Sequence, residues 1–596
     1  MPPIPAEVSG PRRLTLDRLL MFLSCAAFLL GLVTLAAGGF SFSLHGVRVS
    51  SHGVLRPFAL AVASLALAAA RSERRTIQLA AVRRAAERRA RPIAISAALI
   101  ALLIGVRYGT FTADDSDSYG YVSQAGLWLK GNLVVAQPLA VAAPWPDADW
   151  TFSPLGYRPG RTRGTIVPTY AAGLPLTMAG LLACCGSNGV YLAVPALGAL
   201  AIWLTFALGR KLDNATTGAA AAVLLAVSPI FLFQLVTPMS DVPVTTWWLL
   251  ALVLITRTTP ASPFWSGLAA SAALLTRPNL FPLVIVLVVF LASSERTARA
   301  RDIMFFGLGV APGVLAIAAI NAALYGSPLQ SGYGSLSTIF SLEGLRANVA
   351  RYPRWLLESQ TPFVCLAAGA PWLLRRRELV LLLLGMSVAL FACYAFYQPF
   401  DSWLFLRFLL PAIPLLLILS SAVALTLLSR VSWKWQPLAI VTLLALLTAR
   451  YWDTAVSRGA LKQKAGERHF ADVGLFVRQA LPRDAVVLAM MHSGSVRHYS
   501  GRMTLRWDEL PPEWLDPALA FLRANGYVSY LVLEPWEEAQ FRTRFQGHSD
   551  WAALDWPPMA KSEGPDGTRI YDPADRQRFV AGETVKTRTI AAPASP

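Results

Sequence analysis

A short acidic stretch at 113–121, with the sequence ADDSDSYGY, has the residue types best suited to chemistry in this chain. It holds three carboxylates, Asp114, Asp115 and Asp117, and it follows an apolar run that ends near Tyr108. Carboxylates at the end of a membrane-spanning segment are costly to bury and useful to a reaction. A carboxylate in such a loop can act as a general base by taking the proton of an attacking hydroxyl group.

Asp117 is the first candidate for this base, followed by Asp115 and Asp114. A second carboxylate can orient the base or hold a divalent cation, so the three aspartates permit a metal site without requiring one. A structural role fits the sequence equally well, because Asp117 and Ser118 can cap a helix over 119–130 whose N-terminal dipole favours carboxylates. The two roles do not exclude each other.

A lone carboxylate, Asp241, lies between two apolar runs in the segment TPMSDVP at 237–243. The sequence slightly favours a structural role, a helix cap ahead of Pro243, because proline suits the first turn of a helix. Asp241 stays a second candidate site residue, because the predicted topology places it on the same face as Asp117.

Two arginines lie beside or inside apolar runs, Arg277 in LTRPN at 275–279 and Arg407 in LFLRF at 404–408. An arginine at membrane depth must pair, reach toward the surface or bind an anion, and a lipid phosphate suits the guanidinium fork. For Arg277 we favour reaching toward the surface. Arg407 can either pair with the nearby Asp401 or bind a phosphate. We keep Arg277, Arg407 and Asp401 as candidate substrate or phosphate contacts.

Aromatic side chains gather near the predicted outer membrane boundary, and most of them fit an aromatic belt. These are Tyr119, Tyr121, Trp128, Tyr325, Tyr333, Tyr397 and Trp403. Stacking on a sugar is the alternative for any of them, and Tyr121 is a candidate substrate contact because it lies in the acidic stretch. The histidines show no metal-binding spacing with carboxylates, and we interpret His492 and His498 as structural.

The composition is that of an integral membrane protein. The chain has 596 residues, of which 55% are hydrophobic and 15% charged, against about 25% charged in soluble domains. Its net charge of +18 comes from clusters between apolar runs, which is typical of cytoplasmic loops and argues against a nucleic-acid partner. The sequence has no glycine-rich nucleotide fingerprint, so the donor of any group transfer is expected to come through the membrane.

Thirteen apolar runs have membrane-spanning character. They lie near 17–39, 54–70, 93–108, 188–208, 217–236, 243–256, 264–276, 280–293, 303–324, 361–374, 379–397, 405–428 and 435–450. Placing the basic connectors inside gives a multi-pass protein of the cytoplasmic (inner) membrane with a cytoplasmic N-terminus and an extracytoplasmic C-terminus. A further apolar stretch lies at 166–185. If it crossed the membrane, every later basic connector would lie outside, so we predict an interfacial or re-entrant segment there.

Three parts follow from this topology. Residues 1–92 hold two N-terminal spans and a basic connector, 93–450 form the membrane core with an outer acidic loop at 109–187, and 451–596 form a soluble domain. In that domain, 485–490 and 528–534 are predicted strands and 515–525 and 535–545 predicted helices, which indicates a small α/β fold. The end from about 582 is predicted to be disordered.

The sequence resembles polytopic glycosyltransferases of the GT-C class. Within that class it is similar to the bacterial family 39 proteins, which are dolichyl-phosphate-mannose-protein mannosyltransferase-like. The resemblance rests on DSYGY at 117–121, GLPL at 173–176, SP at 228–229 ahead of Asp241, LTRPN at 275–279 and the soluble domain after the last span. It covers most of 93–450. The class implies an all-α membrane domain, here of about thirteen spans, with a small C-terminal soluble α/β domain.

The resemblance implies an inverting transferase that uses a polyprenyl-phosphate sugar, with Asp117 as the base by motif. Two departures concern this assignment: the family often has Asp-Glu where this chain has Asp117 and Ser118, and this chain has two extra spans ahead of the acidic loop. Related enzymes differ in their need for a divalent metal.

The predicted function is glycosyl transfer. The donor of the hexosyl or pentosyl group would be a polyprenyl-phosphate carrier in the membrane, and the acceptor a lipid, glycan or protein on the extracytoplasmic face. Asp241 would position the acceptor or a metal, and Arg407 or Arg277 would stabilise the phosphate leaving group. The alternative is a transporter or flippase of a lipid-linked or small substrate, which predicts charges near the membrane midplane. An inactive scaffold would be insensitive to a change at Asp117.

Overall fold

The computed structural model describes residues 75–293, 298–334, 339–430, 436–563 and 567–590, with a hairpin and isolated positions between 19 and 64. In the hairpin, β1 (Phe40–Leu44) pairs antiparallel with β2 (Val47–Ser51). The predicted spans at 17–39 and 54–70 lie largely outside the described residues, so the two N-terminal spans stay a prediction.

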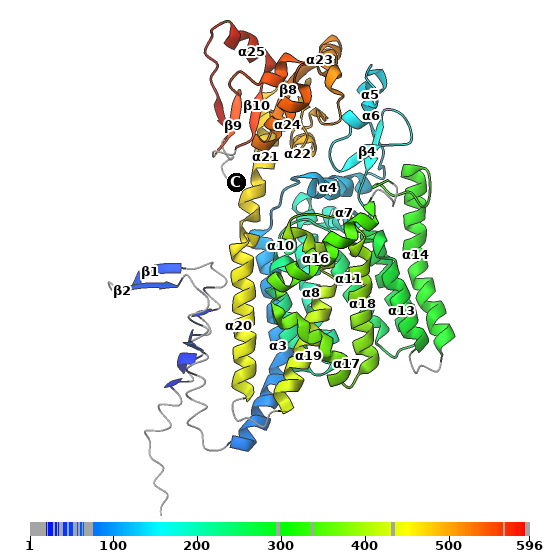
Figure 1. The fold of residues 1–596 in the computed structure, drawn as a ribbon, viewed down its shortest axis with the longest axis vertical. Coiled ribbons are helices and arrows are strands. Elements are labelled where there is room, and N and C mark those ends of the chain that lie inside the picture. Colours follow the sequence, from blue (N-terminus) through cyan, green and yellow to red (C-terminus); the bar gives the residue numbers. More distant parts are fainter. Residues whose placement is uncertain are drawn as a thin grey trace, which may run out of the picture.

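A bundle of mostly apolar helices makes up nearly half of the described chain (Figure 1). Its helices are α3 (Arg75–Tyr108), α8 (Ala193–Leu212), α9 (Ala215–Ala226), α10 (Pro229–Leu235), α11 (Asp241–Ile255), α12 (Ser262–Thr276), α13 (Pro282–Ser293), α14 (Arg299–Tyr325), α16 (Leu342–Gln360), α17 (Ala370–Leu373), α18 (Arg377–Ala395), α19 (Ala412–Arg430) and α20 (Gln436–Ser457). Short 3₁₀ segments join them: η1 (Ser187–Leu192), η2 (Pro278–Leu280), η3 (Pro362–Gly369) and η4 (Trp403–Leu409). Each predicted apolar run from 93 onward is therefore helical.

Six of the described helices are long and apolar enough to cross a membrane, and the pair α9 and α10 would be a seventh span. The axes of that pair differ by 62°. Ser228, between them, has an extended ψ of 127°, because the residue ahead of a proline is disfavoured in the helical conformation. The other apolar helices are shorter, so the count of about thirteen spans stays a prediction.

The predicted acidic loop is folded. It contains α4 (Ser116–Leu129), β3 (Val135–Ala136), α5 (Pro138–Ala142), α6 (Ala148–Thr151), β4 (Tyr157–Pro159), β5 (Thr165–Pro168) and α7 (Gly173–Cys185). The three strands form an antiparallel sheet in the order β3-β5-β4, and α4 packs against α7 at one end of the helix bundle (Figure 1). With 13 residues, α7 is shorter than the roughly 20 needed for a span, in line with the predicted surface segment.

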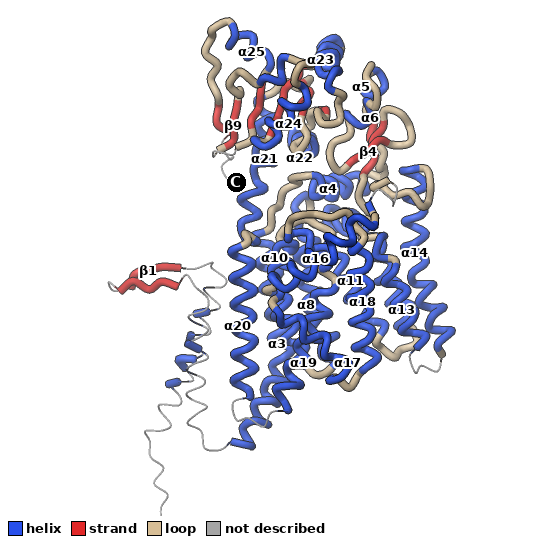
Figure 2. The backbone as a smooth tube through the Cα atoms, viewed as in Figure 1, coloured by secondary structure: helices blue, strands red, loops and turns tan. Residues whose placement is uncertain are grey.

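The C-terminal domain is built on a mixed sheet of six strands in the order β11-β9-β10-β8-β6-β7 (Figure 2). Its strands are β6 (Ala485–Leu488), β7 (Met503–Leu505), β8 (Val528–Leu533), β9 (Ala560–Ser562), β10 (Arg569–Tyr571) and β11 (Arg588–Ile590). Its helices are η5 (Ala460–Lys462), α21 (Gln463–Ala480), α22 (Ser493–Ser500), η6 (Pro512–Trp514), α23 (Leu515–Ala524), α24 (Pro535–Phe545), η7 (Asp550–Ala553) and α25 (Pro573–Val580). The predicted α/β fold is confirmed.

Both ends of this domain differ from the prediction. The predicted border near 450 falls inside α20, which runs on to Ser457. At the other end, 588–590 were expected to be disordered, but they form β11, which pairs in parallel with β9. The reason is Ile590, which is only 3% exposed and anchors an otherwise polar segment in the core of the sheet.

The folded acidic loop and the C-terminal domain share one hydrophobic core. Trp145 and Phe152 from the loop pack in the same buried cluster as Leu488, Leu505 and Trp507 from the C-terminal domain. Backbone groups also bond across this boundary: the Ala113 N–H donates to the Tyr499 hydroxyl at 2.8 Å, and the Leu155 N–H to Ser493 Oγ at 3.0 Å. The two segments, 113–172 and 460–590, therefore form one body, called the α/β layer below.

Candidate active site

A cavity of about 770 Å³ lies where α4 meets the ends of α12, α14 and α18, the segment η4 and residues 169–172. Four of the predicted site residues line it: Asp117, Tyr121, Arg277 and Arg407. Its volume is within the range of about 300–1,000 Å³ that is usual for small-molecule sites. The structure thus brings together four predicted residues from three distant parts of the chain.

The first turn of α4 explains how Asp117 reaches the cavity. Asp115 is the N-cap of α4, and its Oδ1 accepts the backbone N–H groups of Asp117 at 3.0 Å and Ser118 at 3.4 Å. The predicted cap at Asp117 and Ser118 is therefore wrong, because the helix begins three residues earlier, at Ser116. Since Asp115 serves as the cap, the Asp117 carboxylate is left for the cavity.

Asp117 forms an ion pair with Arg407. Asp117 Oδ2 lies 3.1 Å from Arg407 Nη2, and the two side chains are 25% and 19% exposed. The Arg407 guanidinium also lies over the rings of Phe405 and Phe408, 5.4 Å from each centroid. Among the described residues, its buried Nε has no hydrogen-bond partner, so Arg407 keeps a donor for another acceptor.

The expected alternative partner of Arg407, Asp401, lies elsewhere. Its carboxylate pairs with Arg351 and is 89% exposed, and Asp401 is absent from the described residues that line the cavity. Exposure explains the difference, because a carboxylate already in water has little reason to enter a protein cavity. The structure does not bring Asp401 into the candidate site.

A second ion pair joins Asp241 to Arg277, with Asp241 Oδ1 2.6 Å from Arg277 Nη2. Asp241 is completely buried in the first turn of α11 and is not among the described residues that line the cavity. The predicted cap at Asp241 is wrong, because Ser240 holds the N-cap position of α11. Arg277 also donates to Ser240 Oγ at 3.2 Å and to the Tyr394 hydroxyl at 3.0 Å. The Tyr121 hydroxyl donates to the same Ser240 Oγ at 3.0 Å, which ties α4 to this buried network.

Gly120 allows α4 to approach the segment after β5. A Cβ at Gly120 would lie 2.3 Å from a ring carbon of Tyr170, so no larger residue fits there without movement. The Tyr170 hydroxyl bonds to Ser116 Oγ at 2.7 Å, and its ring lies 4.9 Å from that of Tyr121. Tyr170 is thus a wall of the site that sequence reasoning missed, although the glycine in DSYGY signalled a close neighbour.

A smaller cavity of about 260 Å³ adjoins the Asp117–Arg407 pair, and it is lined by Asp114, Asp115 and Asp117 together with Gln463 and Glu467 of α21. Burial, and then the nearby Asp115 and Glu467 carboxylates, raise the pKa of Asp114 well above its usual value. Burial, followed by the Asp115 carboxylate, raises the pKa of Glu467 to about 7. Carboxylates crowded in this way can share protons or hold a divalent cation.

Sequence reasoning did not connect Glu467 with the acidic stretch, because α21 belongs to the C-terminal domain. The contact arises from the shared core of the α/β layer, which no local pattern encodes.

Two kinds of comparison bear on this arrangement. Residues 175–322 match the model of the dolichyl-phosphate-mannose-protein mannosyltransferase family. The crystal structure of ArnT from Cupriavidus metallidurans bound to undecaprenyl phosphate has a TM-score of 0.53 at 12% identity, over 80% of this chain and 97% of that chain. The fold is that of the GT-C glycosyltransferases. The same enzyme in the apo state gives a TM-score of 0.50 at 12% identity, over the same shares of the two chains.

The oligosaccharyltransferase of Archaeoglobus fulgidus, tethered to an acceptor peptide, gives a TM-score of 0.46 at 13% identity, over 80% of this chain and 73% of that chain. No curated protein matches the sequence. The GT-C fold confirms the resemblance predicted from the sequence. Together with the family match it supports an integral membrane glycosyltransferase. The acidic stretch at 113–121 lies outside the matched residues 175–322, so the roles of its carboxylates rest on the geometry alone.

Proposed function

We propose that the protein transfers a sugar from a polyprenyl-phosphate carrier to a hydroxyl-bearing lipid, glycan or protein on the extracytoplasmic face. The acceptor oxygen attacks the anomeric carbon, Asp117 takes the acceptor proton, and the bond between that carbon and the phosphate oxygen breaks, with inversion at the carbon. The observation that carries this proposal is that Asp117 and Arg407 face one cavity as a pair 3.1 Å apart.

Arg407 would hold the phosphate leaving group. Its Nε has no hydrogen-bond partner within the described part of the chain, and its planar fork suits phosphate oxygens. Arg277 also lines the cavity and would add positive charge, although its fork is already shared among Asp241, Ser240 and Tyr394. Positive charge placed in advance where negative charge develops is the largest electrostatic contribution to such a step.

The cavity also suits a lipid carrier. On the side of α13 and α14 its lining is apolar, with Phe281, Ile317 and Ile320. A polyprenyl chain needs such a surface next to the phosphate site, because moving its methylene groups from water onto an apolar surface lowers the free energy. The ArnT structure with undecaprenyl phosphate shows that a GT-C fold accommodates this class of carrier.

A divalent cation remains part of the proposal. Asp114, Asp115 and Asp117 would supply oxygen ligands, and Glu467 lines the same smaller cavity. Such an ion would supply positive charge next to the phosphate leaving group. Asp117 would still accept the proton of the acceptor hydroxyl.

The transporter alternative fits less well. It predicts charged groups in the middle of the bundle. In the structure, both ion pairs lie at helix ends: Asp241 begins α11, Arg277 follows α12, Asp117 is in the first turn of α4, and Arg407 lies in η4 ahead of α19.

Transfer activity tests the proposal. Membranes with wild-type protein, Asp117→Asn or Asp401→Asn receive a panel of radiolabelled polyprenyl-phosphate sugars, and release of sugar from the lipid is measured at equal protein levels. We expect transfer by the wild type and by Asp401→Asn, and loss in Asp117→Asn. Equal transfer by Asp117→Asn would remove Asp117 from the mechanism, and no transfer by any of the three across the panel would contradict the proposed function.

A further inference from the structure

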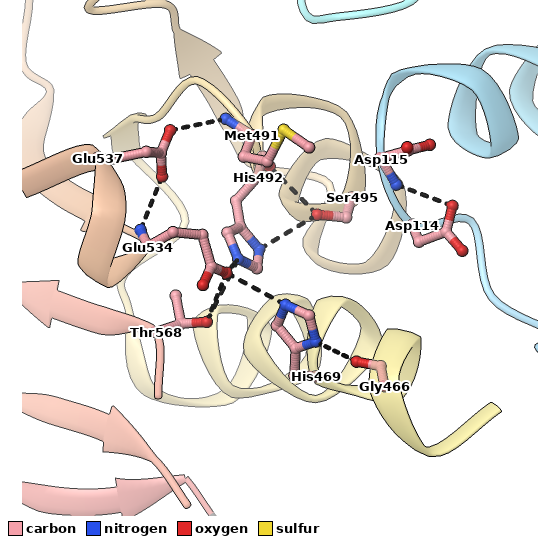
Figure 3. Close-up of polar contacts among 10 residues, drawn as sticks. All are labelled: Asp114, Asp115, Gly466, His469, Met491, His492, Ser495, Glu534, Glu537 and Thr568. Atoms are coloured by element: carbon pink, nitrogen blue, oxygen red, sulfur yellow. Dashed lines mark hydrogen bonds and ion pairs between the residues drawn. The ribbon is translucent and has the colours of Figure 1, made fainter. Parts of the chain in front are cut away.

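Three side chains of the C-terminal domain converge next to the candidate active site but outside the lining of its two cavities. His469 comes from α21, His492 from the turn between β6 and α22, and Glu534 from the end of β8 (Figure 3). One carboxylate oxygen, Glu534 Oε1, lies 3.1 Å from His469 Nε2 and 2.5 Å from His492 Nε2. One ligand atom from each residue lies within 4.8 Å of the other two.

The hydrogen bonds of His469 do not balance for a neutral ring. Its Nδ1 lies 2.6 Å from the Gly466 carbonyl oxygen, which can only accept, and its Nε2 faces the Glu534 carboxylate, which also accepts when ionised. A neutral imidazole has one N–H, so one of these two contacts lacks a proton. A cation next to Nε2, or a second ring proton, removes the conflict. A histidine that gives its other N–H to a carbonyl is the usual arrangement of a metal ligand.

His492 and Glu534 are enclosed. His492 is fully buried and Glu534 is 8% exposed, and the Thr568 hydroxyl donates to the same Glu534 oxygen at 2.8 Å. His492 Nδ1 lies 3.4 Å from Ser495 Oγ, which leaves Nε2 directed at the carboxylate. A buried carboxylate needs a positive partner, and His469, which is 32% exposed, leaves a route for an ion from solvent.

We propose that His469, His492 and Glu534 bind a divalent transition-metal ion of the zinc class. Two imidazole nitrogens and one carboxylate oxygen are a ligand set that zinc accepts, with metal–ligand distances of about 2.0–2.2 Å. The ion takes the place of the protons now shared between the ring nitrogens and the carboxylate. To admit it, the ligand atoms of His492 and Glu534, now 2.5 Å apart, separate by about 0.9 Å. A water would complete the coordination, and the Thr568 hydroxyl donates to the same carboxylate oxygen, Glu534 Oε1.

The ion would fix α21 against the central sheet. His469 lies on α21, while the other ligands lie at the ends of neighbouring strands β6 and β8. The same helix carries Glu467, which faces Asp114 and Asp115 in the smaller cavity. A metal in the C-terminal domain would thus set the position of one carboxylate at the edge of the candidate active site. The metal site is independent of the proposed function, which holds or fails without it.

Metal content of the full chain tests the proposal. The detergent-solubilised protein is loaded with Zn²⁺, passed through a desalting column and analysed by elemental mass spectrometry; a parallel sample with Co²⁺ is read by visible absorption. We expect about one ion per wild-type chain. The variants Glu534→Gln and His469→Gln should lose it, and thermal unfolding of the wild type, but not of these variants, should shift downward with EDTA.

His548→Gln is the matched control, because His548 is an exposed histidine of the same domain. It should retain the ion. His469→Gln keeps the test decisive if Glu534→Gln does not fold, since His469 is part-exposed. A wild type that retains no Zn²⁺ or Co²⁺ would overturn the proposal in favour of a proton-shared cluster, as would equal retention by both His469→Gln and Glu534→Gln.

Discussion

Two aspartate–arginine pairs lie at the same end of the helix bundle, but their surroundings differ. In the Asp241–Arg277 pair the carboxylate is fully buried, and the guanidinium also donates to Ser240 and Tyr394. In the Asp117–Arg407 pair both side chains are part-exposed to the cavity, and Arg407 Nε has no hydrogen-bond partner in the described structure. The same two residue types therefore build a buried tie in one place and an open pair, exposed to the cavity, in the other. In the buried tie, Asp241 Oδ2 also lacks a hydrogen-bond partner among the described residues.

One aromatic ring links the two pairs. Phe408 lies 5.3 Å from the Arg277 guanidinium and 5.4 Å from that of Arg407, each measured to the ring centroid. The ring attracts both cations and stands next to Tyr394, which it stacks on at 4.9 Å. Access and spare donors, rather than residue type, distinguish the pair suited to chemistry.

The largest expected effect is on the open pair. Asp117→Asn removes the proton acceptor and leaves the size of the side chain unchanged, so transfer should fall about a hundredfold to ten-thousandfold. The thermal unfolding temperature should fall less than in Asp241→Asn, because the Asp117 side chain is 25% exposed whereas that of Asp241 is fully buried. A variant that loses activity only in proportion to lost folded protein would make the open pair structural as well.

Asp241→Asn should affect stability more than Asp117→Asn does. It leaves the Arg277 charge without its buried partner, which costs about 3–5 kcal/mol of stability, and the thermal unfolding temperature in detergent should fall clearly. Adding Arg277→Gln removes the unpaired charge and should recover part of the loss. If Asp241→Asn unfolds at the wild-type temperature, the pair is not the buried tie described above.

Arg407→Lys sharpens the comparison within the open pair. Lysine keeps the charge but loses the planar fork and its stacking on Phe405 and Phe408. Losing one hydrogen bond to a charged group should lower kcat/KM for transfer about ten- to hundredfold. The KM for the lipid donor should rise. An unchanged donor KM would separate Arg407 from the phosphate.

Phe408→Leu should have the smallest effect. It keeps an apolar side chain of similar bulk but removes the ring shared by the two guanidinium groups, a contact worth about 0.5–2 kcal/mol. We expect transfer to fall by about two- to thirtyfold with a small loss of thermal stability. A result equal to the wild type in both assays would show that the ring only fills space.

The sequence revealed much of this arrangement because some features are local. The α/β fold of the C-terminal domain followed from β6 and β8, whose buried apolar residues form short runs, and the acidic stretch could be located from its composition. The partners could not be predicted. Arg407 lies 290 residues from Asp117, and the chain offers Asp401 as a closer carboxylate. Only packing shows that Asp401 remains in solvent.

Other features could not be predicted either, because they too depend on how distant segments pack. In the sequence DSD both aspartates are good helix caps, and the choice of Asp115 depends on where the helix meets Tyr170 and Gly156. The three ligands proposed for the metal have no short spacing, because they are brought together by the parallel pairing of β6 with β8 and by α21.

The shared core of the α/β layer also sets an order of events during synthesis. Leu155 and its partner Ser493 are 338 residues apart, so at about 5–20 residues per second a ribosome needs roughly 17–70 s to make the second after the first. During that interval Trp145 and Phe152 lack the side chains that cover them in the finished protein. The nascent chain therefore exposes these two aromatic side chains to other partners while its remaining membrane helices are made.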